Sequence, residues 1–189
     1  MDLRGDWERG RLLTVKTVAM PWEEPVPILV NKRSGVPLYE PNLFALVVLR
    51  PRRVSAEAVG QALRAIAVLI AVLEALHIDL ELRINEGRAL TAREVEVVAR
   101  ACELPIETVH EGGLSALGPG PALVARTTTA IRVYYIARYL EWFLERRASN
   151  LEVSDPRREM LGICRNSIAS ALRMRAPRKV PTGRRTAHE

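Results

Sequence analysis

Apolar residues in the middle of the chain recur every three or four positions, which is the spacing of one helix face. In the segment SAEAVGQALRAIAVLIAVLEALHI, which begins at Ser55, apolar residues occur on nearly every side and the polar positions end early. Ser55 is a favoured N-cap residue, and Glu57 lies in the first turn, where a carboxylate complements the helix dipole. The pattern predicts a central helix that other elements cover.

Two further segments have helical spacing and recognisable ends. In LTAREVEVVARACELP, Thr91 and Glu94 have the spacing of a capping box, and Pro105 stops the helix. Asp155 before Pro156 predicts the N-cap and first turn of a last helix. The residues predicted to face inward from that last helix are Met160, Leu161, Cys164, Ile168, Ala171 and Leu172.

The segments outside these helices are rich in proline and glycine. Residues 1–24 are expected to be irregular or weakly β, and the apolar runs PILV and LFALVVL are expected to form short extended pieces. PNLFALVVLR fits a short helix equally well, with Pro41 in its first turn. Residues 110–123, which include His110, predict a flexible connection, and the basic, proline-broken end of the chain predicts a linker or disordered tail.

These patterns predict a mainly α protein with three parts. The expected division is an N-terminal leader at 1–50, a helical domain at 51–172 and a basic linker or tail at 173–189. The core is expected to be aliphatic, because hydrophobic residues make up 48% of the chain and aromatic residues only 5%.

Charge is distributed unevenly along the chain. Residues 1–120 contain 14 Lys and Arg against 16 Asp and Glu, whereas residues 121–189 contain 14 against 6. The net charge of +6 therefore comes wholly from the last third. Such asymmetry favours an anionic partner, most often nucleic acid, although a solvated basic tail has the same composition.

The segment RTTTAIRVYYIARYLEWFLERR (126–147) predicts a long helix with two occupied faces. One face is an aliphatic stripe, and a threonine among Thr127, Thr128 and Thr129 is expected to cap the helix. The opposite face mixes tyrosine and tryptophan with arginine, and it either packs on another helix or meets a phosphate backbone. The predicted DNA-binding residues, from this helix and the basic stretch after it, are Arg126, Thr128, Thr129, Arg132, Arg138, Arg165, Arg173 and Arg175.

Three segments resemble the N-terminal half of tyrosine recombinases, the phage-integrase type of site-specific recombinase. They are the leader into the first long helix, EGRALTAREVEVVARAC, and TTTAIRVYYIARYLEWFLERR, and the resemblance spans roughly Pro27 to Leu172. The last segment is similar to that family's T-x-x-x-R-x-x-x-x-x-x-Y-L-x-W-L helix, with Phe143 where leucine is usual. The matching residues are Thr128, Arg132, Tyr139, Leu140 and Trp142.

The resemblance implies a SAM-like core-binding domain, a small helical bundle that clamps one face of double-stranded DNA. In that family a linker and a catalytic domain follow, with two arginines, a lysine, histidines and a tyrosine nucleophile. Here none of the three histidines starts an H-x-x-R, and all four tyrosines precede the expected catalytic region. We therefore expect a DNA-binding half that lacks the catalytic domain and is not an enzyme on its own.

The sequence contains no recognisable motif for a metal site, a cofactor site or a membrane segment. Cys102 and Cys164 lie far apart with no zinc-ligand spacing, so we expect reduced thiols, no metal and no cofactor. No long uncharged apolar run or signal-peptide pattern occurs, so we expect a cytoplasmic protein without a membrane partner. The alternatives to DNA binding are a helical protein-interaction module, which includes self-association on DNA half-sites, and a non-functional truncated integrase fragment.

Overall fold

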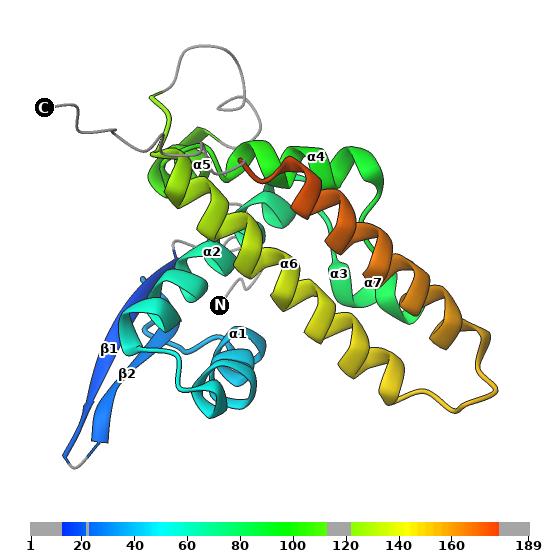
Figure 1. Cartoon of the computed structure of the whole chain (residues 1–189), viewed down its shortest axis with the longest axis horizontal. Coiled ribbons are helices and arrows are strands. Elements are labelled where there is room, and N and C mark those ends of the chain that lie inside the picture. Colours follow the sequence, from blue (N-terminus) through cyan, green and yellow to red (C-terminus); the bar gives the residue numbers. More distant parts are fainter. Residues whose placement is uncertain (1–12, 22, 113–121, 178–189) are drawn as a thin grey trace, which may run out of the picture.

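A computed structural model of the chain describes residues 13–21, 23–112 and 122–177, and the fold is mainly helical, as predicted. The long helices α2 (Ala56–Ala75), α6 (Arg126–Ser149) and α7 (Pro156–Arg175) dominate it (Figure 1). The shorter helices are α1 (Tyr39–Phe44), α3 (Leu80–Asn85), α4 (Ala92–Ala101) and α5 (Ile106–Gly112). Residues 178–189 of the tail predicted at 173–189, and most of the predicted glycine-rich connection, lie outside the described residues.

Helix α2 is the centre of the molecule, as its apolar pattern predicts. Its buried residues include Leu63, Ile66 and Leu69, each with no exposed surface. Ser55 caps it by accepting a hydrogen bond from the Ala58 amide, and Glu24 accepts one from the Ala56 amide at 2.9 Å. By length and composition α2 is the one helix among the described residues that is apolar enough to cross a membrane, and 61% of that apolar stretch is buried within the protein.

The leader forms a hairpin that joins the helical core. Strands β1 (Leu13–Met20) and β2 (Glu23–Asn31) pair antiparallel, which confirms the weak β expectation for residues 13–20. The sheet packs on α2 (Figure 1). Asn42 links β2 to α1, since its side chain accepts a hydrogen bond from the Leu29 amide at 2.7 Å and donates one to the Leu29 carbonyl at 2.9 Å.

The run LFALVVL is helical, so the helix alternative for this segment is confirmed and the extended alternative is wrong. After α1 the chain continues as a π-helical turn, η1 (Ala45–Leu49), and a 3-10 turn, η2 (Arg50–Arg52). Phe44 and Leu49 are fully buried in the common core. Arg53 ends the turn with a φ of 55°, a left-handed conformation that is uncommon for residues other than glycine.

Helices α6 and α7 pack against each other along much of their length, and α6 also packs on α2 (Figure 1). The predicted aliphatic stripe of α6 is confirmed, because Val133, Ile136 and Leu140 are buried. Asp155 caps α7, as expected, and Leu161, Ile168 and Leu172 face the core. The inward placement predicted for Met160 is wrong, since 46% of it is exposed.

Three local features, a cap, a loop and a helix end, also differ from the sequence predictions. The residue that precedes α6 is Ala125, and no side chain caps the helix, so the predicted threonine cap is wrong. His110 lies in α5 rather than in a loop. The last helix runs to Arg175, beyond the predicted boundary at 172.

Candidate nucleic-acid interface

The second face of α6 carries an aromatic cluster along its C-terminal half. Tyr139 is buried, and its ring lies 5.5 Å from that of Phe44 in α1 and 5.7 Å from that of Phe143. Burial raises the pKa of the Tyr139 phenol. Trp142 is half-buried and lies 5.4 Å from Phe44 between ring centres. This part of the second face therefore packs, as one of the two sequence interpretations proposed.

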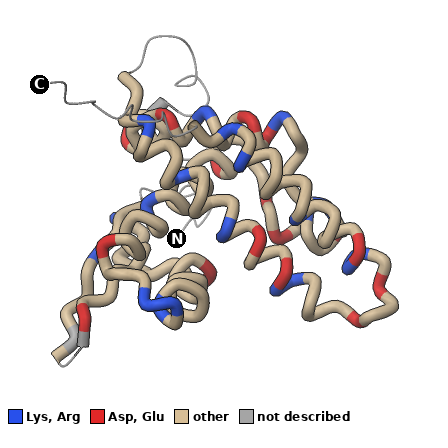
Figure 2. Tube along the Cα trace, in the orientation of Figure 1, with Lys and Arg blue, Asp and Glu red and all other residues tan. Residues whose placement is uncertain are grey.

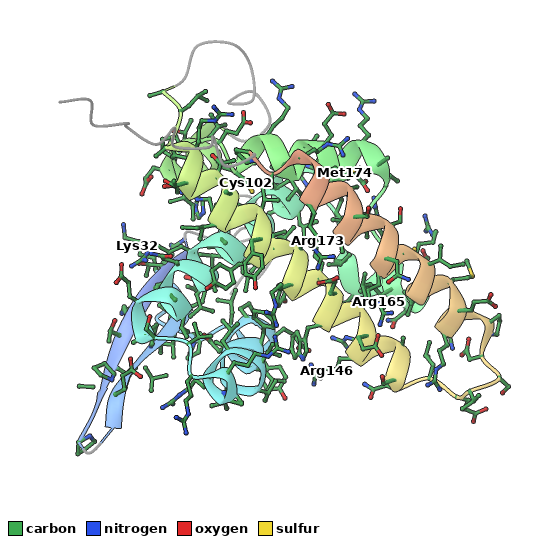
Figure 3. The ribbon with its side chains drawn as sticks, in the orientation of Figure 1. Lys32, Cys102, Arg146, Arg165, Arg173 and Met174 are labelled. Atoms are coloured by element: carbon green, nitrogen blue, oxygen red, sulfur yellow. The ribbon has the colours of Figure 1, made fainter. Side chains whose placement is uncertain are left out.

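Ion pairs join α6 to α1 and α3 beside this cluster. Arg146 and Arg147 both contact the carboxylate of Glu40, and Arg147 also pairs with Glu81. The Arg146 guanidinium lies over the Trp142 ring at 5.5 Å, on the side of α6 that faces α1 (Figure 3). These arginines hold α1 in place, which positions the η1 turn that follows it.

A groove of about 480 Å³ opens where η1 and η2 approach α6 and α7. One wall is the turn after α1, and the other is formed by Trp142 and polar residues of the two long helices. The lining residues are Val47, Val48, Pro51, Arg52, Arg138, Glu141, Trp142, Glu145, Arg165 and Asn166. Single π-helical turns such as η1 frequently occur at functional sites.

The two carboxylates in the groove are already neutralised. Glu145 pairs with Arg165, and Glu141 accepts two hydrogen bonds from Arg173, at 2.6 and 2.7 Å. Arg165 and Arg173 lie between α6 and α7 (Figure 3), so these pairs join the two helices. Acidic and basic positions alternate along α6 and α7, and a basic segment marks the turn before α2 (Figure 2).

Two arginines give the groove a positive charge. Arg52 and Arg138 have no ion-pair partner among residues 13–21, 23–112 and 122–177. Arg138 donates a hydrogen bond to the Tyr134 hydroxyl at 3.1 Å, and 48% of Tyr134 is exposed. The groove can therefore accept an anion without first breaking a salt bridge at either residue.

The structure brings together only part of the predicted DNA-binding set. Arg138 and Arg165 line the groove, and Arg173 lies at its edge, where it donates hydrogen bonds to the lining residue Glu141. Arg126 is exposed at the start of α6, about 18 Å from Arg138 by helix rise. Arg175, at the end of α7, donates to the Ala171 carbonyl at 3.1 Å.

The remaining predicted residues lie near the start of α6. Thr128 is half-buried there. Only 4% of Thr129 is exposed, and its hydroxyl donates to the Ala125 carbonyl at 3.5 Å. Arg132 donates to the carbonyls of Cys102 and Leu104, in the turn between α4 and α5. We assign Thr129 and Arg132 structural roles, because their polar groups are used inside the protein.

Sequence reasoning missed Arg52 and the apolar wall of the groove. The basic run Arg50–Arg53 directly follows an apolar segment, and that run was the available signal. No group of three or more His, Cys, Asp or Glu side chains that could hold a metal ion occurs within the described part of the chain. No family model, curated protein or solved structure matches this chain.

Proposed function

We propose that this chain is a DNA-binding module that holds the phosphate backbone of duplex DNA at the groove between η2, α6 and α7. The observation that carries the proposal is the convergence of Arg52, Arg138 and Arg165 from three separate segments. Arginine is suited to this task, because its planar guanidinium donates paired hydrogen bonds to phosphate oxygens.

The charge distribution supports the same proposal. The excess of basic residues lies in 121–189, the part of the chain that supplies α6, α7 and the basic end. A positively charged region of this kind attracts DNA through its phosphates and releases condensed counterions, without regard to sequence. The resemblance of the α6 segment to tyrosine recombinases points to a core-binding module of that type, in which this chain supplies DNA binding and not cleavage.

The test is binding of the full chain to labelled random-sequence duplex DNA at salt concentrations from about 50 to about 200 mM. We expect affinity to fall steeply with salt. Arg52→Gln and Arg138→Gln should each weaken binding and reduce the slope of log affinity against log salt by about one. The matched control is Arg93→Gln, which removes one charge from α4, a helix that contributes no residue to the groove.

Three outcomes separate the possibilities. Lower affinity and a smaller slope in the two groove variants, with Arg93→Gln unchanged, support the proposal. Equal effects from all three variants would mean that only net charge matters, and the assignment to the groove would be wrong. Absence of duplex binding even at about 50 mM salt would reject the proposed function.

A further inference from the structure

The apolar wall of the groove has no role in holding phosphate. Phosphates are bound by charged and polar side chains and by main-chain amides. Yet 47% of Val47 is exposed, and Val48 and Pro51 line the same wall. An apolar wall in the same groove as Arg52 and Arg138, which have no ion-pair partner among the described residues, fits a ligand that has an apolar part as well as an anionic one.

Trp142 borders the groove beside this wall. Its ring packs inward on Phe44, with centres 5.4 Å apart, the Arg146 guanidinium lies 5.5 Å from its centre, and the residue remains half-buried. Unpaired nucleobases stack on accessible aromatic side chains, and such a contact tolerates any base because every base has a flat π face. Paired bases in a duplex are stacked on each other and offer only their edges.

The polar groups of the groove complement an unpaired nucleotide. Arg52 and Arg138 have no ion-pair partner among the described residues and are available to the flanking phosphates. The Asn166 side-chain amide offers N–H donors to the edge of an unpaired base, while its Oδ1 already accepts a hydrogen bond from the Arg165 Nε at 3.3 Å. The groove volume of about 480 Å³ lies within the range of roughly 300–1,000 Å³ that small-ligand sites occupy.

We propose that the groove takes one unpaired nucleobase, which lies between Trp142 and the Val47 wall while Arg52 and Arg138 hold its phosphates. This inference rests on the proposed DNA binding, and it makes the module selective for DNA that carries a bulged or single-stranded nucleotide. Stacking of one base on an aromatic side chain predicts a preference of about tenfold over the fully paired duplex.

The experiment compares the full chain on three DNA probes of related sequence. They are a paired duplex, the same duplex with one bulged 2-aminopurine, and a single-stranded oligonucleotide. We expect the bulged probe to bind about tenfold more tightly than the paired one, and the 2-aminopurine fluorescence to change on binding. Val47→Asn and Trp142→Leu should each remove this preference, and Val47→Asn should leave affinity for the paired duplex nearly unchanged.

The matched control is Ile163→Asn, the same kind of exchange at an exposed residue of α7 outside the groove. It should keep the full preference. Val47 is half exposed, so its variant is expected to fold and gives a readout even where Trp142→Leu is destabilised. Unfolding curves of each variant establish this before binding is measured.

Each outcome supports or overturns the inference. Equal affinity for bulged and paired DNA, or a preference that persists in Val47→Asn, overturns it while duplex binding stands. Binding to the single strand and the bulged probe without binding to the paired duplex rejects the proposed function and supports the groove as a base site. No binding to any probe rejects both, and a DNA-free dimer that Val47→Asn dissociates would assign the groove to a second copy of the chain.

Discussion

Arg132 joins α6 to the turn between α4 and α5 through its guanidinium. Carbonyls at and after the end of a helix have no partner within it, and Arg132 supplies donors to those of Cys102, the C-cap of α4, and Leu104, in the turn that follows. Burial lowers the pKa of its guanidinium, although arginine remains charged in proteins. Arg132 therefore stabilises the position of α6 against the turn between α4 and α5.

We expect Arg132→Ala to reduce the free energy of unfolding by about 1–3 kcal/mol, because two carbonyls lose a charged donor. Urea denaturation measures this loss. Arg138→Ala is the control on the same helix, with an expected change within about 0.5 kcal/mol. DNA affinity should fall more for Arg138→Ala than for Arg132→Ala. A smaller slope of log DNA affinity against log salt in Arg132→Ala alone would contradict the structural role of Arg132.

The buried thiol of Cys102 should make the stability of the fold decrease at alkaline pH. Burial raises its pKa to about 12 from the ordinary 9.0, while the nearby charge of Arg132 acts in the opposite direction. Above about pH 9 the unfolded chain loses this proton and the folded chain keeps it, so the unfolded state binds fewer protons and stability falls as pH rises. Burial of Tyr139 raises the pKa of its phenol, which adds to the same trend.

The expected result is a melting temperature that decreases steadily from about pH 8 to about pH 10.5. Cys102→Ala should make this decrease smaller. Cys164→Ala is the control, because Cys164 is only half-buried. An alkaline decrease that is identical in all three proteins would show that Cys102 does not contribute to it.

At the scale of the element, the N-cap position of α6 is occupied by Ala125, whose side chain cannot cap the helix. Ala125 has extended ψ and no side-chain acceptor for the free amides of the first turn. Ala125→Asp should raise the free energy of unfolding by about 1 kcal/mol, since aspartate accepts from those amides and complements the dipole. Ala122→Asp, three residues earlier, is the control and should have little effect. Equal urea midpoints for the Ala125→Asp and wild-type proteins would contradict this account.

The caps show which elements a sequence can predict. The starts of α2, α4 and α7 depend on residues within four positions of each other, such as Thr91 and Glu94, and all three were predicted. The start of α6 was not, because three consecutive threonines offer equivalent caps and packing decides among the possible starts. Helices α3 and α5 span six and seven residues, too few turns for a periodic pattern to appear.

The groove depends on contacts that no sequence spacing encodes. Helical periodicity placed Arg138 and Trp142 on a common second face of α6, and this much of the site was predictable. That η1 and η2 cover this face follows from the Glu40 ion pairs and the burial of Phe44, which join residues about 100 positions apart. The basic run Arg50–Arg53 therefore marked Arg52 as a charged position, but no local pattern could place it against α6.

At the scale of the molecule, the hairpin and the helices share one core. Leu29, Phe44 and Leu49 are fully buried in the same cluster as Leu63 and Ile66 of α2. Burial of each such side chain contributes about 1.5–3 kcal/mol. The three together approach the total stability of an ordinary domain, about 5–15 kcal/mol.

A chain that starts at Pro51 should therefore fail to unfold cooperatively. It would lose the three buried side chains and the Glu24 cap of α2, and it would expose the α2 surface that the sheet covers. Circular dichroism during heating should show a broad loss of helix without a sigmoidal transition, and a dye that binds apolar surface should fluoresce with the shortened chain but not with the full one. A sharp transition in the shortened chain would instead make residues 51–177 an independent domain, with the hairpin as an appendage. A second chain that starts at Leu38 lacks the hairpin but keeps α1 and η1, so it separates the effect of the hairpin from the effect of the groove wall.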